Sequence, residues 1–355
     1  MSSGEWAAST GSSPATNDDP VRIGILGAAR IAPLAIVSPA RATGARLVAV
    51  AARNPARAAE FADEHGVERV VDSYDALLAD PEVEVVYNPL PNGLHGPWNT
   101  AALRAGKHVL SEKPFAVDAG EARDVVAAAR SAGRHVLEGF HYPFHPLYRR
   151  IVELVTDGAI GQVRHVEAPM RMPTPGPEDP RWDLALAGGS TMDLGCYAFH
   201  VGRHLGRAFG GGEPVVERAV AAEHPDHPGV DEWFSVEARY PTGATATLGS
   251  DMNSGQVWDF HLTVVGTRGS LRAGEFLRPH VDDSLLLRRD GHDDVVEHLG
   301  DRSSYTYQLE AFTALVRDGR ALPYDPLEDA IAQASFVESA YRAAGLEPRP
   351  RSTID

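Results

Sequence analysis

The sequence predicts an α/β protein of two domains: an N-terminal doubly wound parallel sheet, followed by an α/β domain with a large, mostly antiparallel open sheet. Three observations predict this fold. Short apolar runs alternate with helix-like stretches from residue 21 to about residue 142. Beyond that point, strand-like segments follow one another between turn signals. The 355 residues, 43% of them hydrophobic, are enough for two ordinary domains with real cores. We expect a disordered tail over residues 1–20, a first domain over 21–142 and a second over 143–355.

Six segments of the first domain are expected to be strands: 21–26, 46–52, 68–72, 83–88, 107–112 and 134–140. They are short, continuous and rich in Val and Leu, which is typical of strands that are covered on both faces in a parallel sheet. Helix-like stretches lie between them, such as 55–65, which has Pro55 at a first helical position, and 118–133. Strands and helices in alternation build right-handed βαβ units.

The second domain begins with a predicted helix over 145–158 that ends at Gly158. Strands are expected at 163–172, 215–222, 233–240, 244–250, 259–266 and 284–290, and helices at 191–205, 307–319 and 326–345. Turn signals such as PTG at 241–243 and GTRG at 266–269 separate neighbouring strands. This spacing favours antiparallel pairing.

Composition excludes several classes of function. The formal net charge of −16, with no basic patch, argues against nucleic-acid binding. No window approaches the roughly 18 consecutive apolar residues of a membrane span. The first 20 residues lack the basic start and apolar core of a secretory signal, and their polar composition predicts disorder. A single cysteine, Cys196, rules out an internal disulfide and suits a reducing cytoplasm.

The turn after the first strand resembles a nucleotide-binding turn. In the pattern G-x-G-x-x-G, the three glycine positions fall on Gly27, Ala29 and Ala32, so only the first glycine is kept. The pattern needs small residues so that a pyrophosphate can approach the amides at a helix N-terminus, and alanine still permits moderately close approach. Any buried strand-turn-helix could look the same, but this one opens the first βαβ unit.

The end of the second strand favours NADP over NAD. An NAD site usually has an acidic residue there, which accepts hydrogen bonds from the ribose hydroxyls. This chain has Ala51, Ala52, Arg53 and Asn54 instead. With no carboxylate to repel a phosphate and an arginine to bind one, the 2′-phosphate of NADP fits better. The alternative is that Arg53 is an ordinary solvated surface side chain.

Four stretches occur in the order found in the glucose–fructose oxidoreductase/inositol dehydrogenase (Gfo/Idh/MocA) family: GILGAARIA (24–32), YNPLPNGLHGPW (87–98), GKHVLSEKP (106–114) and GGSTMDLGCYAFH (188–200). The chain resembles this family over about residues 21 to 345, and most of all its dihydrodiol dehydrogenase and ketosugar reductase branch. The resemblance implies a Rossmann domain, an α/β substrate domain with an open sheet, and NAD(P)-dependent hydride transfer. It also implies cofactor contacts from Gly27, Ala29, Arg30, Ile31, Arg53, Pro89, Asn92, His95, Glu112, Lys113 and Pro114.

Lys113 directly follows a buried strand, at the edge where open α/β sheets bind their ligands. A partly buried lysine is costly unless it is paired or functional. One interpretation is an ion pair with Glu112 or another acid. The resemblance instead matches Lys113 to the family's active-site lysine, with Pro114 shaping the nicotinamide pocket. His95 and Asn92 follow the fourth strand at the same edge, although His95 could simply begin the next helix.

Asp193, Tyr197 and His200 are spaced at i, i+4 and i+7, so a helix would present all three on one face. The surrounding MDLGCYAF is apolar and follows a flexible GGS segment, which indicates a buried helix facing a cleft. Many relatives have histidine where this chain has Tyr197. We expect Lys113 to lower the pKa of Tyr197, so that it can transfer a proton, and Asp193 to orient the substrate or the tyrosine. His200 either hydrogen-bonds to a residue that contacts the substrate or is an ordinary histidine of the core.

On the substrate side we expect Arg181 and Trp182, together with His200, to line the pocket. The segment FHYPFHP (140–146) has Pro143 where relatives commonly carry arginine. HPDHP (224–228) and the pairs His141/His145 and His200/His204 have metal-like spacing, but no carboxylate or cysteine set completes a site, so no metal is expected.

These residues predict an NADP-dependent dehydrogenase or reductase that acts on a secondary alcohol or ketone of a sugar, cyclitol or dihydrodiol. One alternative is a family member that retains and recycles its cofactor in redox-neutral sugar chemistry. The other is a cofactor-sensing module without catalysis. The exposed face of a large sheet needs cover, so we also expect a homodimer or homotetramer through the C-terminal sheet.

Overall fold

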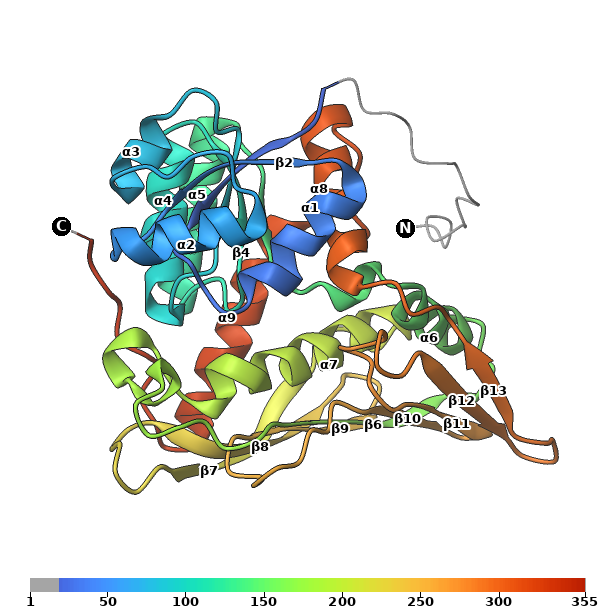
Figure 1. Ribbon diagram of the computed structural model, residues 1–355. Coiled ribbons are helices and arrows are strands. Elements are labelled where there is room, and N and C mark those ends of the chain that lie inside the picture. Colours follow the sequence, from blue (N-terminus) through green and yellow to red (C-terminus); the bar gives the residue numbers. More distant parts are fainter. Residues whose placement is uncertain (1–18, 355) are drawn as a thin grey trace.

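The computed structural model describes residues 19–354, so residues 1–18 of the predicted tail lie outside the described residues. The molecule consists of a parallel sheet wrapped by helices above a broad, mostly antiparallel sheet (Figure 1). The predicted fold class is confirmed. The predicted domain boundary after residue 142 stays a prediction.

Five parallel strands form the N-terminal sheet in the order β2-β1-β3-β4-β5. They are β1 (Arg22–Leu26), β2 (Arg46–Ala51), β3 (Val85–Asn88), β4 (His108–Ser111) and β5 (Val136–Glu138). The helices of this part are α1 (Ser38–Thr43), α2 (Pro55–His65), α3 (Tyr74–Ala79), α4 (His95–Arg104) and α5 (Ala119–Ala132). Almost every residue of the five strands is buried, because helices cover both faces of the sheet.

The expected strand at 68–72 is wrong as a full strand. It is reduced to a single parallel bridge between Val70 and Val50, beside β2 at the edge of the sheet. Val70 is 41% exposed, so this edge segment gains little burial from longer pairing. The order of the remaining strands is unaffected, and the first turn still lies at the carboxyl edge next to β2 and β3.

The C-terminal sheet has eight strands in the order β13-β12-β11-β10-β6-β9-β8-β7. They are β6 (Val163–Arg171), β7 (Val215–Glu223), β8 (Asp231–Arg239), β9 (Thr245–Asp251), β10 (Leu262–Gly266), β11 (Gly269–Ala273), β12 (Ser284–Arg289) and β13 (Val295–His298). Among these eight strands of the described residues, only β6 and β9 pair in parallel. The sequence did not predict β11 and β13, because both are short and β13 is mostly exposed at the sheet edge.

Four helices follow the parallel sheet in sequence: α6 (Pro146–Thr156), α7 (Cys196–Ala208), α8 (Ser304–Asp318) and α9 (Pro326–Ala343). Figure 1 shows α6 and α7 on the face of the large sheet that is turned toward the N-terminal part. Helix α8 packs on α1, and its Leu309 and Phe312 enter the core of the parallel sheet. Helix α9 contacts both α5 and β7. The end of the chain therefore joins the two sheets and fixes the space between them. Among residues 19–354, no helix is long and apolar enough to cross a membrane.

Candidate active site

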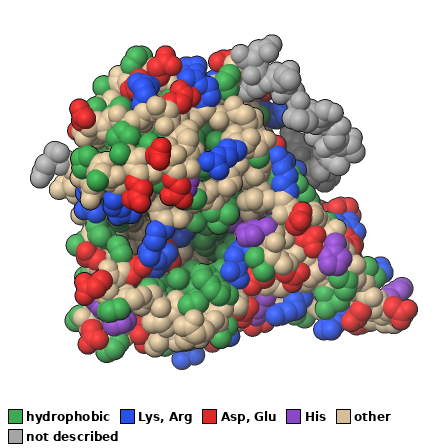
Figure 2. Space-filling view, viewed as in Figure 1, with side chains coloured by type: hydrophobic (Ala, Val, Ile, Leu, Met, Phe, Trp, Pro, Cys, Tyr) green, Lys and Arg blue, Asp and Glu red, His purple; other side chains and the backbone are tan. Residues whose placement is uncertain are grey.

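A cleft of about 1380 Å³ lies between the carboxyl edge of the parallel sheet and the helix-covered face of the large sheet. Figure 2 shows the molecule hollowed between its two halves, with hydrophobic side chains inside and charged side chains at the rim. The predicted residues that line it are Gly27, Ala29, Arg30, Ile31, Arg53, Pro89, Asn92, His95, Glu112, Lys113, Arg181, Asp193 and Tyr197. Pro114, Trp182 and His200 do not line it.

One end of the cleft is the turn after β1. Gly27 has a φ of 91°, in the left-handed region that favours glycine, and its amide donates a 2.6 Å hydrogen bond to the carbonyl of Ala51. A Cβ at this position would approach Leu90 to 3.1 Å. Ala28 and Ala29 follow, and the chain then enters a helical turn at Pro33. Small side chains therefore leave a backbone cradle that fits the pyrophosphate of a dinucleotide.

Two arginines lie at this end of the cleft, next to the end of β2. Arg53 is exposed, and Asn54 cannot replace a ribose-binding acid because its side chain caps α2 by accepting from the amides of Ala56 and Arg57. Arg57 also lines the cleft and donates to the carbonyl of Ala28 at 3.2 Å. Sequence reasoning missed Arg57, although the expected helix over 55–65 places it in the first helical turn, close to Arg53 just before the helix.

At the other end of the cleft, Lys113 follows the last residue of β4 by two positions and forms an ion pair with Asp193. Its Nζ donates to the carbonyl oxygen of Asp193 at 2.7 Å and to Oδ1 of Asp193 at 3.2 Å. The neighbouring Glu112 is not its partner, because Glu112 accepts a 2.8 Å hydrogen bond from the hydroxyl of Tyr87. Burial lowers the pKa of Lys113, but the attraction of Asp193, with smaller contributions from Cys196 and Glu112, raises it overall above its usual value. Lys113 is therefore a fixed cation at the edge of the cleft.

Asp193 is held by two cations. Its Oδ2 accepts from Nε of Arg181 at 2.7 Å, while Oδ1 faces Lys113. Burial raises the pKa of Asp193, yet Lys113 and Arg181 together hold it well below its usual range. Asp179, which sequence reasoning missed, bonds Arg181 and also pairs with Arg30 at 2.7 Å. Since Arg30 belongs to the turn after β1, this row of alternating charges crosses from one half of the molecule to the other.

Tyr197 lies beside Lys113, whose Nζ is 5.2 Å from the centre of the tyrosine ring. Its hydroxyl lies 3.3 Å from Nε2 of His141. The expectation that Lys113 lowers the pKa of Tyr197 is wrong: burial raises this pKa well above its usual value, and the Asp193 carboxylate contributes in the same direction. Asp193 neutralises Lys113, so in the open cleft Tyr197 is a neutral phenol and a proton donor.

His95, Asn92 and Pro114 hold the backbone around Lys113. The ring nitrogens of His95 lie 2.7 Å from the carbonyl of Pro114 and 2.6 Å from that of Leu90. Burial lowers the pKa of His95 to about 4. The amide of Asn92 donates to the carbonyl of Ala187 in the second half of the chain at 3.2 Å. The Asn92 contact therefore connects loops on either side of the cleft, whereas the His95 contacts join two loops of the N-terminal half. The expected cofactor contacts of the three residues stay predictions.

The start of the helical segment that carries Asp193 is rigidly packed, although a flexible GGS segment was expected. Gly189 has a φ of 124°, and a Cβ there would lie 2.2 Å from Oδ1 of Asp231. Oδ2 of Asp231 accepts from the Ser190 hydroxyl and the Thr191 amide, and Arg349 pairs with the same carboxylate. A buried ion pair therefore fixes the entry to Asp193.

Trp182 and His200 lie outside the cleft, which corrects their expected contact with substrate. Trp182 is 2% exposed, and its ring packs on that of His224 with centroids 4.5 Å apart. His200 is fully buried: Nδ1 lies 2.6 Å from the Tyr142 hydroxyl and Nε2 lies 3.0 Å from Asp329. His200 therefore does not share the cleft-facing side of the helix with Asp193 and Tyr197, because its side chain points into the protein interior.

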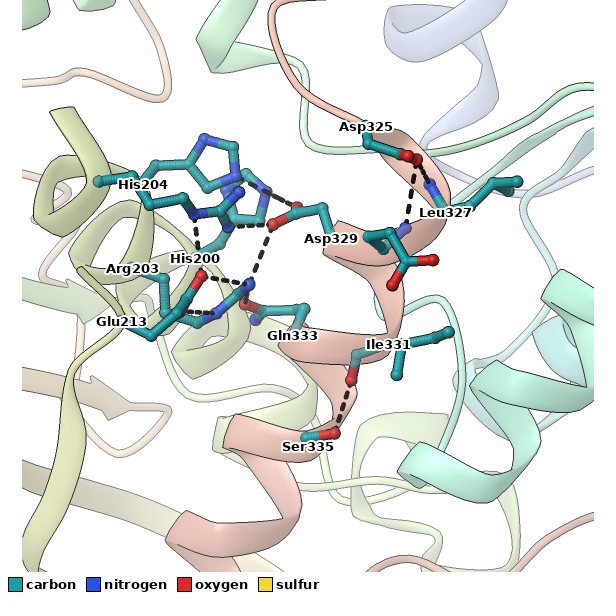
Figure 3. Close-up of polar contacts among 12 residues, drawn as sticks. His200, Arg203, His204, Glu213, Asp325, Leu327, Asp329, Ile331, Gln333 and Ser335 are labelled. Carbon is teal, nitrogen blue, oxygen red and sulfur yellow. Dashed lines mark hydrogen bonds and ion pairs between the residues drawn. The ribbon is translucent and has the colours of Figure 1, made fainter. Parts of the chain in front are cut away.

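The expectation that no carboxylate joins the His200/His204 pair is also wrong. Asp329 on α9 reaches both rings, and one ligand atom from each of the three residues lies within 4.8 Å of the others (Figure 3). Arg203 and Arg207 bind the other oxygen of the same carboxylate. Each ring can donate one hydrogen bond to Asp329, and two adjacent guanidinium groups oppose a further cation. We interpret the group as an ion-pair network that joins α7 to α9.

On the substrate side, several lining residues were not predicted. Trp258 is 48% exposed, and the guanidinium of Arg278 lies 4.8 Å from its ring centre and 4.9 Å from that of Phe260. His141 and Tyr305 close the floor around Tyr197. Pro143, the departure from the usual arginine, is buried and does not line the cleft. These residues come from distant segments, and only the aromatic pair in WDF (258–260) gave a sequence signal.

Two family profiles match the chain. Residues 21–140 match the oxidoreductase family with an NAD-binding Rossmann fold, and residues 148–272 match the GFO/IDH/MocA C-terminal domain.

Curated proteins match over almost the whole chain. D-xylose 1-dehydrogenase (NADP(+)) 2 of Haloferax volcanii is 34% identical over 90% of this chain and 96% of its own length. Trans-1,2-dihydrobenzene-1,2-diol dehydrogenase of Mus musculus is 30% identical over 85% and 89%. Among solved structures, a 3-ketoreductase from Actinomadura kijaniata in complex with NADP and TDP-benzene has a TM-score of 0.83, with 29% identity over 92% of this chain and 98% of that one.

Proposed function

The chain belongs to the GFO/IDH/MocA family of oxidoreductases, and we propose that it transfers hydride between NADP(H) and a secondary alcohol or ketone of a sugar, cyclitol or dihydrodiol. One observation carries this proposal: a single cleft joins the backbone cradle at Gly27 to the group of Lys113, Asp193 and Tyr197. A cradle for a dinucleotide and a proton-transfer group thus open onto the same space.

The roles follow from the charges. Lys113 is positioned to stabilise the negative charge that develops on the substrate oxygen during reduction, because it is a cation that Asp193 orients. Tyr197 gives its proton to that oxygen, or takes it back in oxidation. Arg181 keeps Asp193 ionised. The nicotinamide, when bound, supplies or accepts hydride at the substrate carbon.

For the adenosine end we propose that Arg53, with Arg57 beside it, binds the 2′-phosphate of NADP. Two features support this: no acid follows β2, and both guanidinium groups line the cleft. The names of relatives agree, since the Haloferax volcanii enzyme is named for NADP(+) and the Actinomadura kijaniata structure contains NADP.

Arg53→Ala should weaken NADP binding and leave NAD binding almost unchanged. A charge-assisted hydrogen bond to a phosphate contributes about 1.5–3 kcal/mol, so the expected loss is roughly 10- to 150-fold. Titration of both cofactors measures it, with Arg123→Ala on the exposed side of α5 as a control. Adding Ala52→Asp should invert the preference, because a carboxylate repels the phosphate. Equal affinity of the wild-type protein for NADP and NAD would contradict the assignment.

A panel of polyols and ketosugars, assayed with NADP and NADPH, tests the reaction itself. We expect turnover with at least one sugar-like alcohol or ketone. Two alternatives give different results: a recycled cofactor would co-purify and resist dialysis, and a sensing module would bind NADP without turnover of any substrate. The floor of the cleft favours catalysis, because sensing does not require Lys113, Asp193 and Tyr197.

We also propose that the chain forms a homodimer or homotetramer through the C-terminal sheet. Figure 1 shows no helix on the lower face of this sheet among the described residues. Cross-strand pairing places Thr247, Glu167 and Thr263 side by side on that face, together with the half-exposed Trp233 and Val265. A monomeric mass in light scattering of the purified protein would contradict this proposal.

For the location we propose the cytoplasm. The single cysteine, Cys196, is fully buried on α7, so neither an internal disulfide nor an exposed thiol is involved in the fold. Recovery of the protein outside the cytoplasmic fraction of its cell would contradict this location.

A further inference from the structure

Behind Tyr197, three side chains form a continuous row of hydrogen-bonding groups. The Tyr197 hydroxyl lies 3.3 Å from Nε2 of His141, and Nδ1 of the same ring lies 2.8 Å from the hydroxyl of Ser304. They come from α7, from the turn after β5 and from the first residue of α8. All three side chains are at least nine-tenths buried.

The row matters because Tyr197 is 6% exposed even in the open cleft. A substrate and a dinucleotide that fill the cleft would leave water no direct path to the phenol. A tyrosine that gives up a proton there must recover one through the protein or wait for the cleft to empty.

The imidazole of His141 has the required chemistry. Burial lowers its pKa to about 3, and the nearby basic groups of Lys113, His280 and His145 act in the same direction, so the ring stays neutral. A neutral imidazole has one donor and one acceptor nitrogen. When Ser304 donates to Nδ1, Nε2–H donates to the Tyr197 oxygen, and the phenol proton is free to face the substrate. In the other tautomer, Nε2 accepts from Tyr197 and Nδ1–H donates to Ser304.

We propose that His141 and Ser304 relay protons between solvent and Tyr197 during turnover, which rests on the function proposed above and deepens it. In ketone reduction, the O–H bond of Tyr197 breaks as its proton passes to the substrate oxygen. Nε2–H of His141 then gives its proton to the phenolate, and Nδ1 takes the proton of the Ser304 hydroxyl. Ser304 is itself 1% exposed, but it begins α8 directly after the exposed Arg302 and the half-buried Ser303, and it regains a proton from water that enters at this end of the helix. Oxidation runs the same transfers backwards, and the relay carries no electrons.

The neighbouring His145 shows what a purely structural histidine does in the same segment. It is fully buried, and its Nδ1 accepts from the amide of Leu147 at the start of α6. It does not line the cleft. His145 therefore provides a matched control four residues from His141.

His141→Gln tests the relay in the full-length enzyme with NADPH and a ketosugar that the wild type reduces. Glutamine keeps a donor and an acceptor but cannot pass a proton by changing tautomer. We expect kcat to fall about 10- to 100-fold, near the lower range of general acid–base effects, while KM and NADPH affinity change less than about twofold. Ser304→Ala should lower kcat in the same way. His145→Asn keeps the helix cap and should behave as wild type.

His141→Ala with added imidazole provides the second readout. Imidazole in solution should restore part of kcat if proton transfer is what was lost, whereas a packing defect would not respond. Wild-type kcat in His141→Gln, or an inactive His141→Ala that imidazole does not rescue, would overturn the relay. If Tyr197→Phe itself is fully active, the proton role of Tyr197 in the proposed function fails. If Tyr197→Phe is inactive and His141→Gln is normal, only the relay fails.

Discussion

Lys113→Ala should lower turnover by about 100-fold or more, because removing one preorganised group that stabilises a developing oxyanion typically costs this much. NADP binding should remain near the wild-type value, since the cradle at Gly27 and the arginine at residue 53 are unchanged. The fold should survive, because Asp193 keeps its ion pair with Arg181. Steady-state rates and cofactor titration on the same protein sample separate the two effects.

The chain provides its own control for this variant. Lys107 and Lys113 are its only lysines, although it has 33 lysines and arginines in all. Lys107 lies just before β4, and its Nζ donates to the carbonyls of Asp80 and Val83, away from the cleft. Lys107→Ala should therefore affect stability and leave the turnover of the folded protein unchanged. Near-normal turnover in Lys113→Ala would contradict a catalytic role and would leave Lys113 with only a structural role as the ion-pair partner of Asp193.

Tyr197→Phe should also lower turnover about 100-fold or more, at the lower end of what loss of a positioned general acid costs. Phenylalanine keeps the ring contact with Phe140, whose centroid lies 5.3 Å away, and loses only the hydroxyl and its 3.3 Å contact with His141. The melting temperature and KM should therefore change little while kcat falls. Full activity of this variant would move proton transfer to a water molecule.

The pH dependence gives a second readout of the same role. Burial raises the pKa of Tyr197 and Asp193 raises that of Lys113, so both stay protonated through the neutral range. Ketone reduction needs both protons, and its rate should not fall between about pH 6 and pH 9. Alcohol oxidation needs the phenolate and should rise with pH. A reduction rate that falls as pH rises through about 7 would point to a group of ordinary histidine pKa instead.

The sequence predicts the fold class well, because buried parallel strands and alternating antiparallel strands leave different patterns. The errors concern segments that gain little burial. Residues 68–72 have the Val content of a strand but form one bridge at an exposed edge. Strand β13, an edge strand of the other, larger sheet, is mostly exposed and has no apolar alternation to reveal it.

The sequence could predict those site residues whose position depends on a single strand and the turn after it. Gly27 and Lys113 follow strands that end at the same edge, so both could be placed from topology. The partner of Lys113 could not: Asp193 lies 80 residues later, and local sequence suggested Glu112 as readily. The protonation of Tyr197 depends first on its burial and then on neighbours such as Tyr305 and Glu112, which only the tertiary structure brings together.

Helical spacing was informative only in part. It grouped Asp193, Tyr197 and His200, but the helix carries His200 into the interior, where it meets Tyr142 and Asp329. Asp329 belongs to α9, a helix that closes the chain, and nothing in its own segment indicates histidine partners. Long-range packing decides which polar residues of an amphipathic helix reach a cleft.

The most direct test of hydride transfer is to follow its isotope. Wild-type protein is incubated with a ketosugar substrate from the panel and NADPH that carries deuterium on the transferred position of the nicotinamide. Mass spectrometry of the product should find one deuterium on the former carbonyl carbon, in proportion to the NADPH consumed. Product that forms without deuterium would contradict direct transfer from exchangeable NADPH and would indicate a retained, recycled cofactor instead.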